Sequence, residues 1–291
     1  MWSNFINATA MSLSINELNL FEPQVMAIVN VTDDSFYVGS RTFSEQAVVE
    51  RVERAIAEGA SILDVGGYSS RPGAKDIDQE QEWQRVEMGL RIIRQISNDV
   101  AISVDTFRSV VAERALQSYG PLIINDISAG EIDDRIIDVV AKYDVPYVAM
   151  HMRGTPQTMQ QNTEYDGDVA VQVVEYFRQR VEFLRARGVN KIILDPGFGF
   201  AKSLKQNYEL LLGLDKVCAM GYPVLAGLSR KSMIYNLLGV SPSDDATLAG
   251  TKILNYQALC AGATILRVHD VKEAVEVLEQ FKIQNSKFKI G

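Results

Sequence analysis

Short apolar runs recur along the chain at nearly even intervals. Each run has about four to seven residues, is rich in Val, Ile and Leu, and contains few polar positions. Strands that are buried on both faces of a parallel sheet have this pattern. The runs predict eight strands, at Val25–Val31, Ser61–Val65, Ala101–Val104, Leu122–Asn125, Val145–Met150, Lys191–Leu194, Tyr222–Ala226 and Ala263–Val268.

Stretches with apolar residues three or four apart separate these runs and predict amphipathic helices. Glu45–Glu58 is such a stretch, and Gly59 follows it as a helix stop signal. The other predicted helices are Glu80–Ile96, Phe107–Tyr119, Ile132–Tyr143, Val169–Arg187, Asp244–Cys260 and Val271–Phe281.

The even spacing predicts an α/β fold, a single (β/α)₈ TIM barrel of parallel strands. Asn30 and Arg267 are 237 residues apart over seven units, about 34 residues each, and a βαβ crossover needs about 30. A doubly wound open sheet is the alternative, but residues 30–36 after the first strand lack the pattern G-x-G-x-x-G. We expect residues 1–23 to form an N-terminal leader segment and 24–291 the barrel domain.

The composition narrows the function classes. The 291 residues are 47% hydrophobic and 23% charged, which excludes collagen, coiled coils and intrinsic disorder. The net charge of −8 disfavours a general nucleic-acid binder, and no apolar run reaches the roughly 18 residues of a membrane span. Cys218 and Cys260 lie in apolar stretches, so we expect buried thiols and a cytoplasmic location.

Each predicted strand ends in polar residues, at the edge where barrel enzymes carry their catalytic groups. Helix capping accounts for Thr106, Asp126 and Asp270, and we expect a structural role for Asp64 as well. His151 is expected to be a structural histidine. For Arg153 and Lys202, a surface position and a contribution to positive potential stay equally open.

Capping does not account for four other strand-end residues. They are cationic or imidazole side chains close to helix N-termini, where positive charge is unfavourable unless an anion bridges it. These residues predict an anion-binding site at the C-terminal edge of the barrel. They are Arg71, Lys231, Arg267 and His269.

Eight strand-end motifs, in this order, resemble dihydropteroate synthase, and the resemblance covers about Gln24 to Phe281. The motifs are Asn30-Val31-Thr32 with Asp34-Ser35-Phe36, Ser70-Arg71-Pro72-Gly73, Val104-Asp105-Thr106, Asn125-Asp126-Ile127, Met150-His151-Met152, Asp195-Pro196-Gly197-Phe198-Gly199-Phe200, Ser229-Arg230-Lys231-Ser232 and Arg267-Val268-His269-Asp270.

The resemblance implies a transferase of folate biosynthesis. It would join (7,8-dihydropterin-6-yl)methyl diphosphate to 4-aminobenzoate, giving 7,8-dihydropteroate and diphosphate with the help of Mg²⁺. It further implies a homodimer that sulfonamides inhibit, with small-molecule substrates and neither nucleic acid nor membrane as a partner. The pterin ring can delocalise a cation on its methylene carbon, so we expect a dissociative displacement.

The resemblance also implies the site residues, in groups that overlap. The pterin would be bound by Asp105, Asn125, Met150, Asp195, Phe200, Gly227 and Lys231. The diphosphate would be bound by Asn30, Ser70, Arg71, Arg267 and His269, with Mg²⁺ at Asn30. The aminobenzoate would be bound by Phe36, Ser70, Arg71, Pro72, Phe200, Lys231 and Ser232. The catalytic set would be Asp105, Asp195, Lys231, Arg267 and His269.

The residue types agree with these roles. Asp and Asn match the donors and acceptors along a pterin edge, and cations with a metal neutralise the leaving diphosphate. Three loop positions depart from the family pattern. Asp33 stands where the family usually has Pro, Tyr68 where it usually has Glu, and Ser70 where it usually has Thr.

A pterin-binding methyltransferase module that serves a corrinoid partner is the alternative function. It shares the Asp and Asn anchors for the pterin. We expect it to lack the Ser-Arg-Pro loop and the Ser-Arg-Lys and Arg-x-His sets, all of which this chain has.

Overall fold

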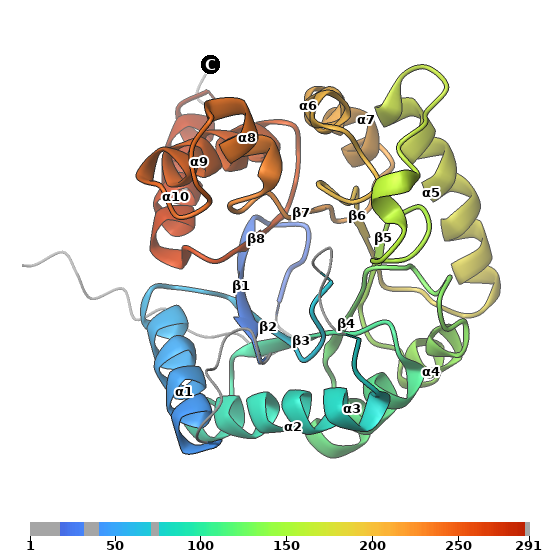
Figure 1. Ribbon diagram of the computed structural model, residues 1–291, viewed down its shortest axis with the longest axis vertical. Coiled ribbons are helices and arrows are strands. Elements are labelled where there is room, and N and C mark those ends of the chain that lie inside the picture. The colour runs from blue at the N-terminus through green and yellow to red at the C-terminus, as the bar shows by residue number, and fades with distance from the viewer. Residues whose placement is uncertain (1–17, 32–40, 71–75, 289–291) are drawn as a thin grey trace, which may run out of the picture.

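The computed structural model describes residues 18–31, 41–70 and 76–288. Within these residues, eight parallel strands form one sheet in the order β6-β5-β4-β3-β2-β1-β8-β7. The bridge between Leu194 and Val224 joins β6 to β7 and closes the sheet into a barrel. Helices surround this ring (Figure 1), so the predicted (β/α)₈ barrel is confirmed.

The strands are β1 Gln24–Asn30, β2 Ile62–Gly66, β3 Ala101–Asp105, β4 Ile123–Asp126, β5 Tyr147–Met150, β6 Ile192–Asp195, β7 Leu225–Ala226 and β8 Ile265–Val268. The helices are α1 Arg41–Ala57, α2 Gln79–Ile96, α3 Ser109–Tyr119, α4 Arg135–Tyr143, α5 Val169–Ala186, α6 Leu204–Leu212, α7 Leu214–Cys218, α8 Ser232–Leu238, α9 Asp245–Cys260 and α10 Val271–Phe288, with a 3₁₀ turn, η2, at Met159–Gln161.

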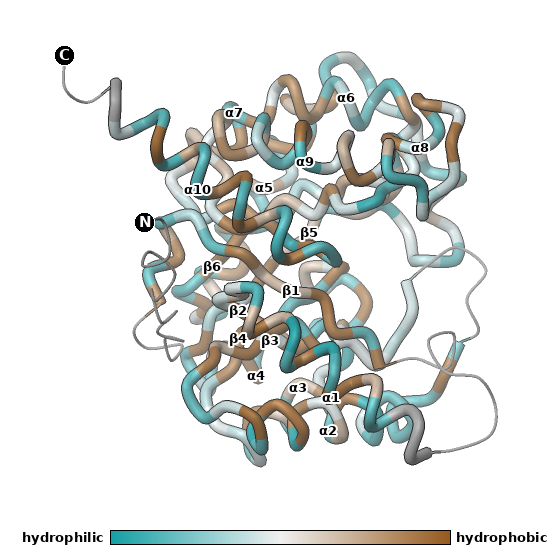
Figure 2. Tube along the Cα trace, turned by 90° about the vertical axis from the view of Figure 1, so that its left-hand side faces the viewer, coloured by the Kyte–Doolittle hydropathy of each residue, from teal (hydrophilic) through white to brown (hydrophobic). Residues whose placement is uncertain are grey.

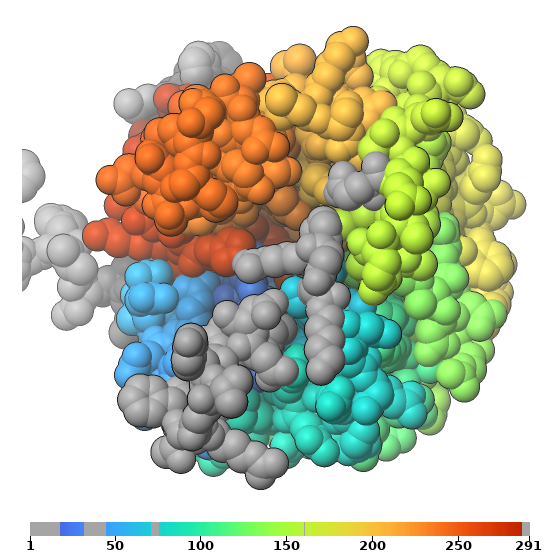
Figure 3. Space-filling model, in the orientation of Figure 1, coloured from blue at the N-terminus to red at the C-terminus, as the bar shows by residue number. Residues whose placement is uncertain are grey.

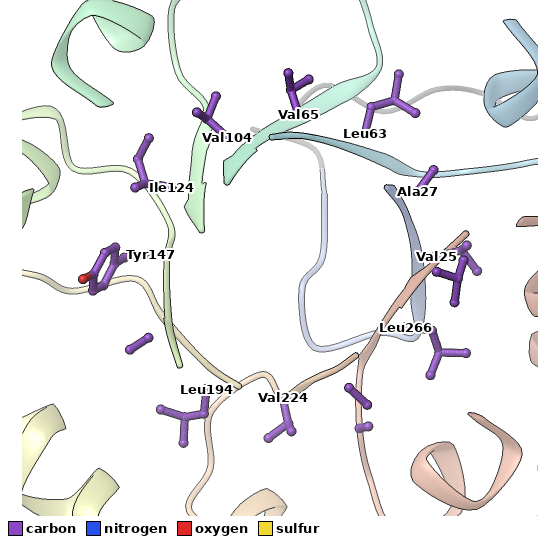
Figure 4. Close-up of a cluster of buried hydrophobic side chains, with 14 of the residues drawn as sticks. Val25, Ala27, Leu63, Val65, Val104, Ile124, Tyr147, Leu194, Val224 and Leu266 are labelled. Atoms are coloured by element: carbon purple, nitrogen blue, oxygen red, sulfur yellow. The ribbon is translucent and has the colours of Figure 1, made fainter. Parts of the chain in front are cut away.

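Alternation along the strands divides the core into two layers. Outward-facing side chains such as Val65, Ile124 and Tyr147 fill the space between strands and helices (Figure 4). The helices show hydrophilic turns beside hydrophobic ones, as expected of helices with one buried face (Figure 2). Inward-facing residues near the start of each strand fill the N-terminal end of the barrel. Met26 and Ile62 are two of them, and Leu18 packs against this group.

Strand register brings the polar strand ends to one height. Gly66 of β2 pairs with Asp105 of β3, and Asp105 pairs in turn with Asn125 of β4. Met150 of β5 pairs with Asp195 of β6. These residues all face inward, so the interior of the barrel is polar at its C-terminal end, whereas its N-terminal end is apolar.

The periodicity predicted α9 but missed α6, α7 and α8. α6 begins after a capping box made by Ser203 and Gln206, a signal that the apolar spacing does not contain. The run at Tyr222–Ala226 shortens to a two-residue β7. The prediction of buried thiols is wrong for Cys260, which is exposed at the end of α9, and Cys218 is half-buried. None of the described helices is long and apolar enough to cross a membrane.

Candidate active site

A pocket lies at the C-terminal ends of the strands, on the side from which Figure 3 views the molecule. The empty space in it amounts to about 370 Å³, including solvent at its open mouth. Its lining residues come from strands β3, β4, β5, β6 and β8 and from the loops after β2, β4, β6 and β7. They are Ser70, Asp105, Asn125, Ile127, Met150, Asp195, Gly197, Phe198, Phe200, Gly227, Lys231 and Arg267.

Arg267 holds two carboxylates together at the floor of this pocket. Its Nε donates to Asp64 Oδ2 and its Nη2 to Asp105 Oδ2, both over 2.6 Å. Asn125 Nδ2 also donates to Asp64 Oδ2, over 3.1 Å. Nη1 of Arg267 makes no hydrogen bond to the described residues. One guanidinium therefore pairs with two carboxylates. The cluster of Arg267, Asp64 and Asp105 has a net negative charge when both carboxyls are ionised.

The pKa of the Asp105 carboxyl is raised by its surroundings. Burial raises its pKa to about 7, with a further increase from the charge of Asp64, although the positive charge of Arg267 opposes both. A carboxyl with this pKa changes charge near neutral pH. Asp105 is therefore expected to give the pocket a pH-sensitive hydrogen-bonding group.

Asp195 is anchored by the turn that follows β6. Its Oδ1 accepts a 2.8 Å hydrogen bond from the backbone N–H of Gly197. Gly197 has a φ of +70°, and a Cβ there would lie 2.1 Å from the carbonyl oxygen of His151, so only glycine fits. Burial raises the pKa of Asp195, while the Gly197 N–H and the Lys231 charge lower it.

Lys202 fixes the same turn from behind. Its buried Nζ lies 3.0 Å from the carbonyl oxygens of Gly197 and Phe200 and from Nδ1 of His151. Burial lowers the pKa of Lys202 to about 7. Burial and the Lys202 charge lower the pKa of His151 well below its ordinary range, so the imidazole is neutral. Lys202 is thus a buried structural amine, and its predicted surface alternative is wrong.

Lys231 approaches the pocket from the start of α8. Its Nζ lies 4.5 Å from the centre of the Phe200 ring, within the range of a cation–π contact. A Cβ on Gly199 would lie 3.2 Å from the Lys231 side chain, so the second glycine of the β6 turn leaves room for the lysine.

The loops after β7 and β8 are joined beside the pocket. Ser229 Oγ lies 3.0 Å from His269 Nδ1 and accepts a hydrogen bond from the His269 N–H. Arg230 makes a bidentate ion pair with Asp270, at 2.8 and 2.9 Å. The side chain of Asp270 is therefore engaged with Arg230, whereas the sequence predicted a helix cap.

The pocket brings together nine of the residues expected from the resemblance. Asn30, Ser232 and His269 do not line it. Phe36, Arg71 and Pro72 lie outside the described residues. The nine that line it are Ser70, Asp105, Asn125, Met150, Asp195, Phe200, Gly227, Lys231 and Arg267.

Asp64 is the site residue that the sequence reasoning missed. It was expected in a cap or a loop, and it lies instead inside the barrel, bonded to Arg267 and Asn125. The available signal was its position in an inward-facing strand slot two residues before Gly66. Asp126, by contrast, faces outward as a structural residue, accepting hydrogen bonds from Ser128, Gly130 and Tyr147.

The described residues contain no cluster of three or more His, Cys, Asp or Glu side chains that could enclose a metal ion. Asn30 offers one amide oxygen at the end of β1. A Cβ on Gly66 would lie 3.8 Å from Asn30 Oδ1 and 3.7 Å from Asp105 Oδ2, so these two oxygens flank Gly66. Asp105 Oδ2 is already paired with Arg267, which leaves Asn30 Oδ1 as the oxygen for a metal. A single protein oxygen fits Mg²⁺, which usually binds one or two protein oxygens and takes its other ligands from phosphates and water.

Comparisons with known proteins agree on one family. The family model described as pterin binding enzyme matches residues 26–269. A dihydropteroate synthase of Streptococcus pyogenes is 41% identical, over 88% of this chain and 94% of its own. Two structures of the Xanthomonas albilineans dihydropteroate synthase each cover 92% of this chain and 95% of their own. The structure with 4-aminobenzoic acid has a TM-score of 0.83 and is 37% identical in sequence. The structure with 7,8-dihydropteroate has a TM-score of 0.80 and is 35% identical.

Proposed function

Because the chain belongs to the dihydropteroate synthases within the family of pterin-binding enzymes, we propose that its pocket carries out the reaction of these enzymes. The chain is a transferase of folate biosynthesis. It joins (7,8-dihydropterin-6-yl)methyl diphosphate to 4-aminobenzoate and yields 7,8-dihydropteroate and diphosphate. The observation that carries the site assignment is the convergence of nine expected residues on one pocket.

The pterin binds at the floor of the pocket. Asp105, Asn125 and Asp195 face the ring edge, where carboxylate and amide groups match its ring nitrogens, amino group and carbonyl. Lys231 donates to the carbonyl side. Met150, Phe200 and Gly227 line the walls around the ring. A floor of buried polar groups also gives specificity, because a ligand that lacks the matching groups leaves them unpaired.

The diphosphate binds above the floor, beside Asn30, Arg267 and His269, with Ser70 nearby. Nη1 of Arg267 has no bond to the described residues, so it can donate to a phosphate oxygen while Nε and Nη2 hold Asp64 and Asp105. Asn30 would hold Mg²⁺, which when bound neutralises charge on the leaving diphosphate. Arg71 belongs to the same proposed set and lies outside the described residues.

The aminobenzoate binds at the mouth of the pocket. Phe200 and Lys231 contact its ring, Ser70 lies at the rim, and Ser232, the first residue of α8, is placed near its carboxylate. Phe36, Arg71 and Pro72 complete this proposed set outside the described residues.

The displacement is dissociative. The C–O bond to the diphosphate breaks first, and the pterin ring delocalises the positive charge left on the methylene carbon. Arg267 and His269 stabilise the negative charge on the departing diphosphate, while the carboxylates at the floor stabilise the cationic ring. The amine nitrogen of aminobenzoate then forms the C–N bond and releases a proton.

One assay tests this function. Purified chain supplied with both substrates and Mg²⁺ is expected to form dihydropteroate and diphosphate in equal amounts, with a lower rate when Mg²⁺ is chelated. Slow diphosphate release is expected when aminobenzoate is omitted, because bond breaking comes first. No dihydropteroate with both substrates would contradict the function, and no diphosphate release without aminobenzoate under any condition would contradict the dissociative order.

Pterin affinity is expected to depend on pH through Asp105. An ionised carboxylate accepts hydrogen bonds from the pterin, and its protonation competes with the ligand. Because the pKa of Asp105 is raised to about 7, affinity should fall roughly tenfold per pH unit below that value. Calorimetric titration of a pterin between pH 5.5 and 8.5 measures this. Asp105→Asn should remove the dependence, and an equally steep fall in that variant would assign it to another group.

We further propose a homodimer in the cytoplasm, built from one barrel domain over residues 24–291. Ile253 of α9 and Ile283 of α10 are exposed on helices that pack together, and covering such side chains favours association. Sedimentation equilibrium should give twice the monomer mass, and a monomer at micromolar concentration would contradict the dimer.

A further inference from the structure

Arg230 has a backbone conformation that arginine rarely adopts. Its φ is +51°, in the left-handed region that favours glycine. Strain of this kind persists only where the surroundings fix the residue, and it is concentrated at functional sites. The strain is notable here because Arg230 lies between Ser229, which bonds to His269, and Lys231, which lines the pocket.

Four hydrogen bonds from the described part of the chain hold Arg230 in this conformation. Its guanidinium donates twice to Asp270 and once, over 3.1 Å, to the carbonyl of Pro242. Its backbone N–H donates over 3.1 Å to Oγ1 of the buried Thr251 in α9. Three different segments therefore fix the loop between β7 and α8 at this one residue.

Two cross-links then join the loops after β7 and β8. Ser229 bonds to His269, and the next residue on each loop forms the ion pair between Arg230 and Asp270. Lys231 is thereby fixed relative to His269. In the proposed function Lys231 holds the pterin ring and His269 the diphosphate, so these cross-links set the span between the two ends of one substrate.

We propose that the ion pair between Arg230 and Asp270 is a positioning pair, which uses a strained turn to hold Lys231 and His269 at the spacing of the pterin diphosphate. This rests on the proposed function of the site. Neither residue needs to touch the substrate, since the pair acts through Lys231 and His269. Small misplacements of such groups lower turnover strongly, by about a hundredfold for a displacement of 1 Å.

Comparison of Arg230→Ala with Arg230→Gly separates positioning from a merely structural role. Both variants lose the ion pair, but only glycine adopts a positive φ without strain. Arg230→Gly is therefore expected to melt at least about 2 °C above Arg230→Ala. We expect kcat/KM for the pterin diphosphate to fall about 10- to 100-fold in both. Recovery of kcat/KM as well as the melting temperature in Arg230→Gly would overturn the proposal.

Ligand binding gives a second readout that needs no turnover. The wild-type chain and Arg230→Gly are titrated with the pterin diphosphate and with the pterin alcohol that lacks the diphosphate. The preference for the diphosphate should fall about tenfold in the variant, because the spacing matters only to a ligand that reaches both ends. An unchanged preference would overturn the proposal.

Two further variants complete the design. Asp270→Asn removes the partner charge while Arg230 stays, and should reproduce the loss of preference. Arg187→Ala breaks a more exposed ion pair, with Asp138 on the outer helices, and should change neither readout. If the wild type bound both pterins but formed no dihydropteroate, the function would fail, while the binding comparison would still decide the role of the pair.

Discussion

Replacement of Arg267 by Met is expected to lower the free energy of unfolding by about 3–5 kcal/mol at pH 8, the cost typical of removing one partner from a buried ion pair. Arg267 is the shared partner of Asp64 and Asp105 at the barrel centre, so its loss leaves the buried Asp64 carboxylate and the partly buried Asp105 carboxylate without their cation. Turnover should also be lost, because the same guanidinium is proposed to contact the diphosphate. Urea unfolding measures the first effect.

The loss of unfolding free energy in Arg267→Met should become larger as pH rises. The Arg267 charge opposes the rise in the pKa of Asp105, so the variant should have an Asp105 pKa still further above its unfolded value. A raised folded-state pKa contributes stability at low pH, which disappears as pH rises through that pKa. The deficit of Arg267→Met should therefore grow from pH 6 to pH 9.

Two variants control this measurement. Adding Asp64→Asn to Arg267→Met removes one of the unpaired charges and should restore part of the stability without restoring turnover. Arg187→Met breaks the exposed pair with Asp138 and should cost less than about 1 kcal/mol. Equal losses in Arg267→Met and Arg187→Met would contradict the central role of Arg267 in the barrel.

Replacement of Asp195 by Asn is expected to weaken pterin binding by roughly 10²-fold or more, with the fold retained. Asn keeps the size of the side chain and an oxygen to accept from Gly197. It places an NH₂ group where the pterin edge requires an acceptor, and it removes a negative charge near Lys231. Hydrogen bonds to charged groups contribute about 1.5–3 kcal/mol each, and two of them account for this loss. Fluorescence titration with a pterin measures it.

Asp126→Asn is the matched control for this prediction. Asp126 is also a buried strand-end carboxylate, but it faces the helices and bonds to Tyr147 and Ser128. Its variant should lose stability while the folded fraction binds pterin normally. Unchanged pterin affinity in Asp195→Asn would show that Asp195 is not an anchor.

The hydrophobic pattern predicted the fold because every strand of a parallel barrel is buried on both faces. It missed α6, which depends on a capping box, and α7 and α8, which have only five and seven residues, and it predicted more than the two residues of β7. Short elements whose geometry is set by caps and neighbouring strands leave a weak periodic signal.

The strand-end motifs predicted most of the pocket, because side chains that end parallel strands meet at one edge. They did not predict how those side chains pair. The motifs predicted Arg267 as a cation for an anionic ligand, and no pattern in the chain indicated that Asp64, 203 residues away, is its partner. The strain at Arg230 was equally hidden, since backbone dihedral angles follow from the tertiary contacts that hold the turn.

A crystal structure of the chain with a bound pterin would decide whether the barrel pocket is the pterin site. We expect the pterin ring in this pocket, with its edge within hydrogen-bond distance of Asp105, Asn125 and Asp195 and its carbonyl near Lys231. A pterin bound outside this pocket, or in it without contact to Asp105 and Asp195, would contradict the account.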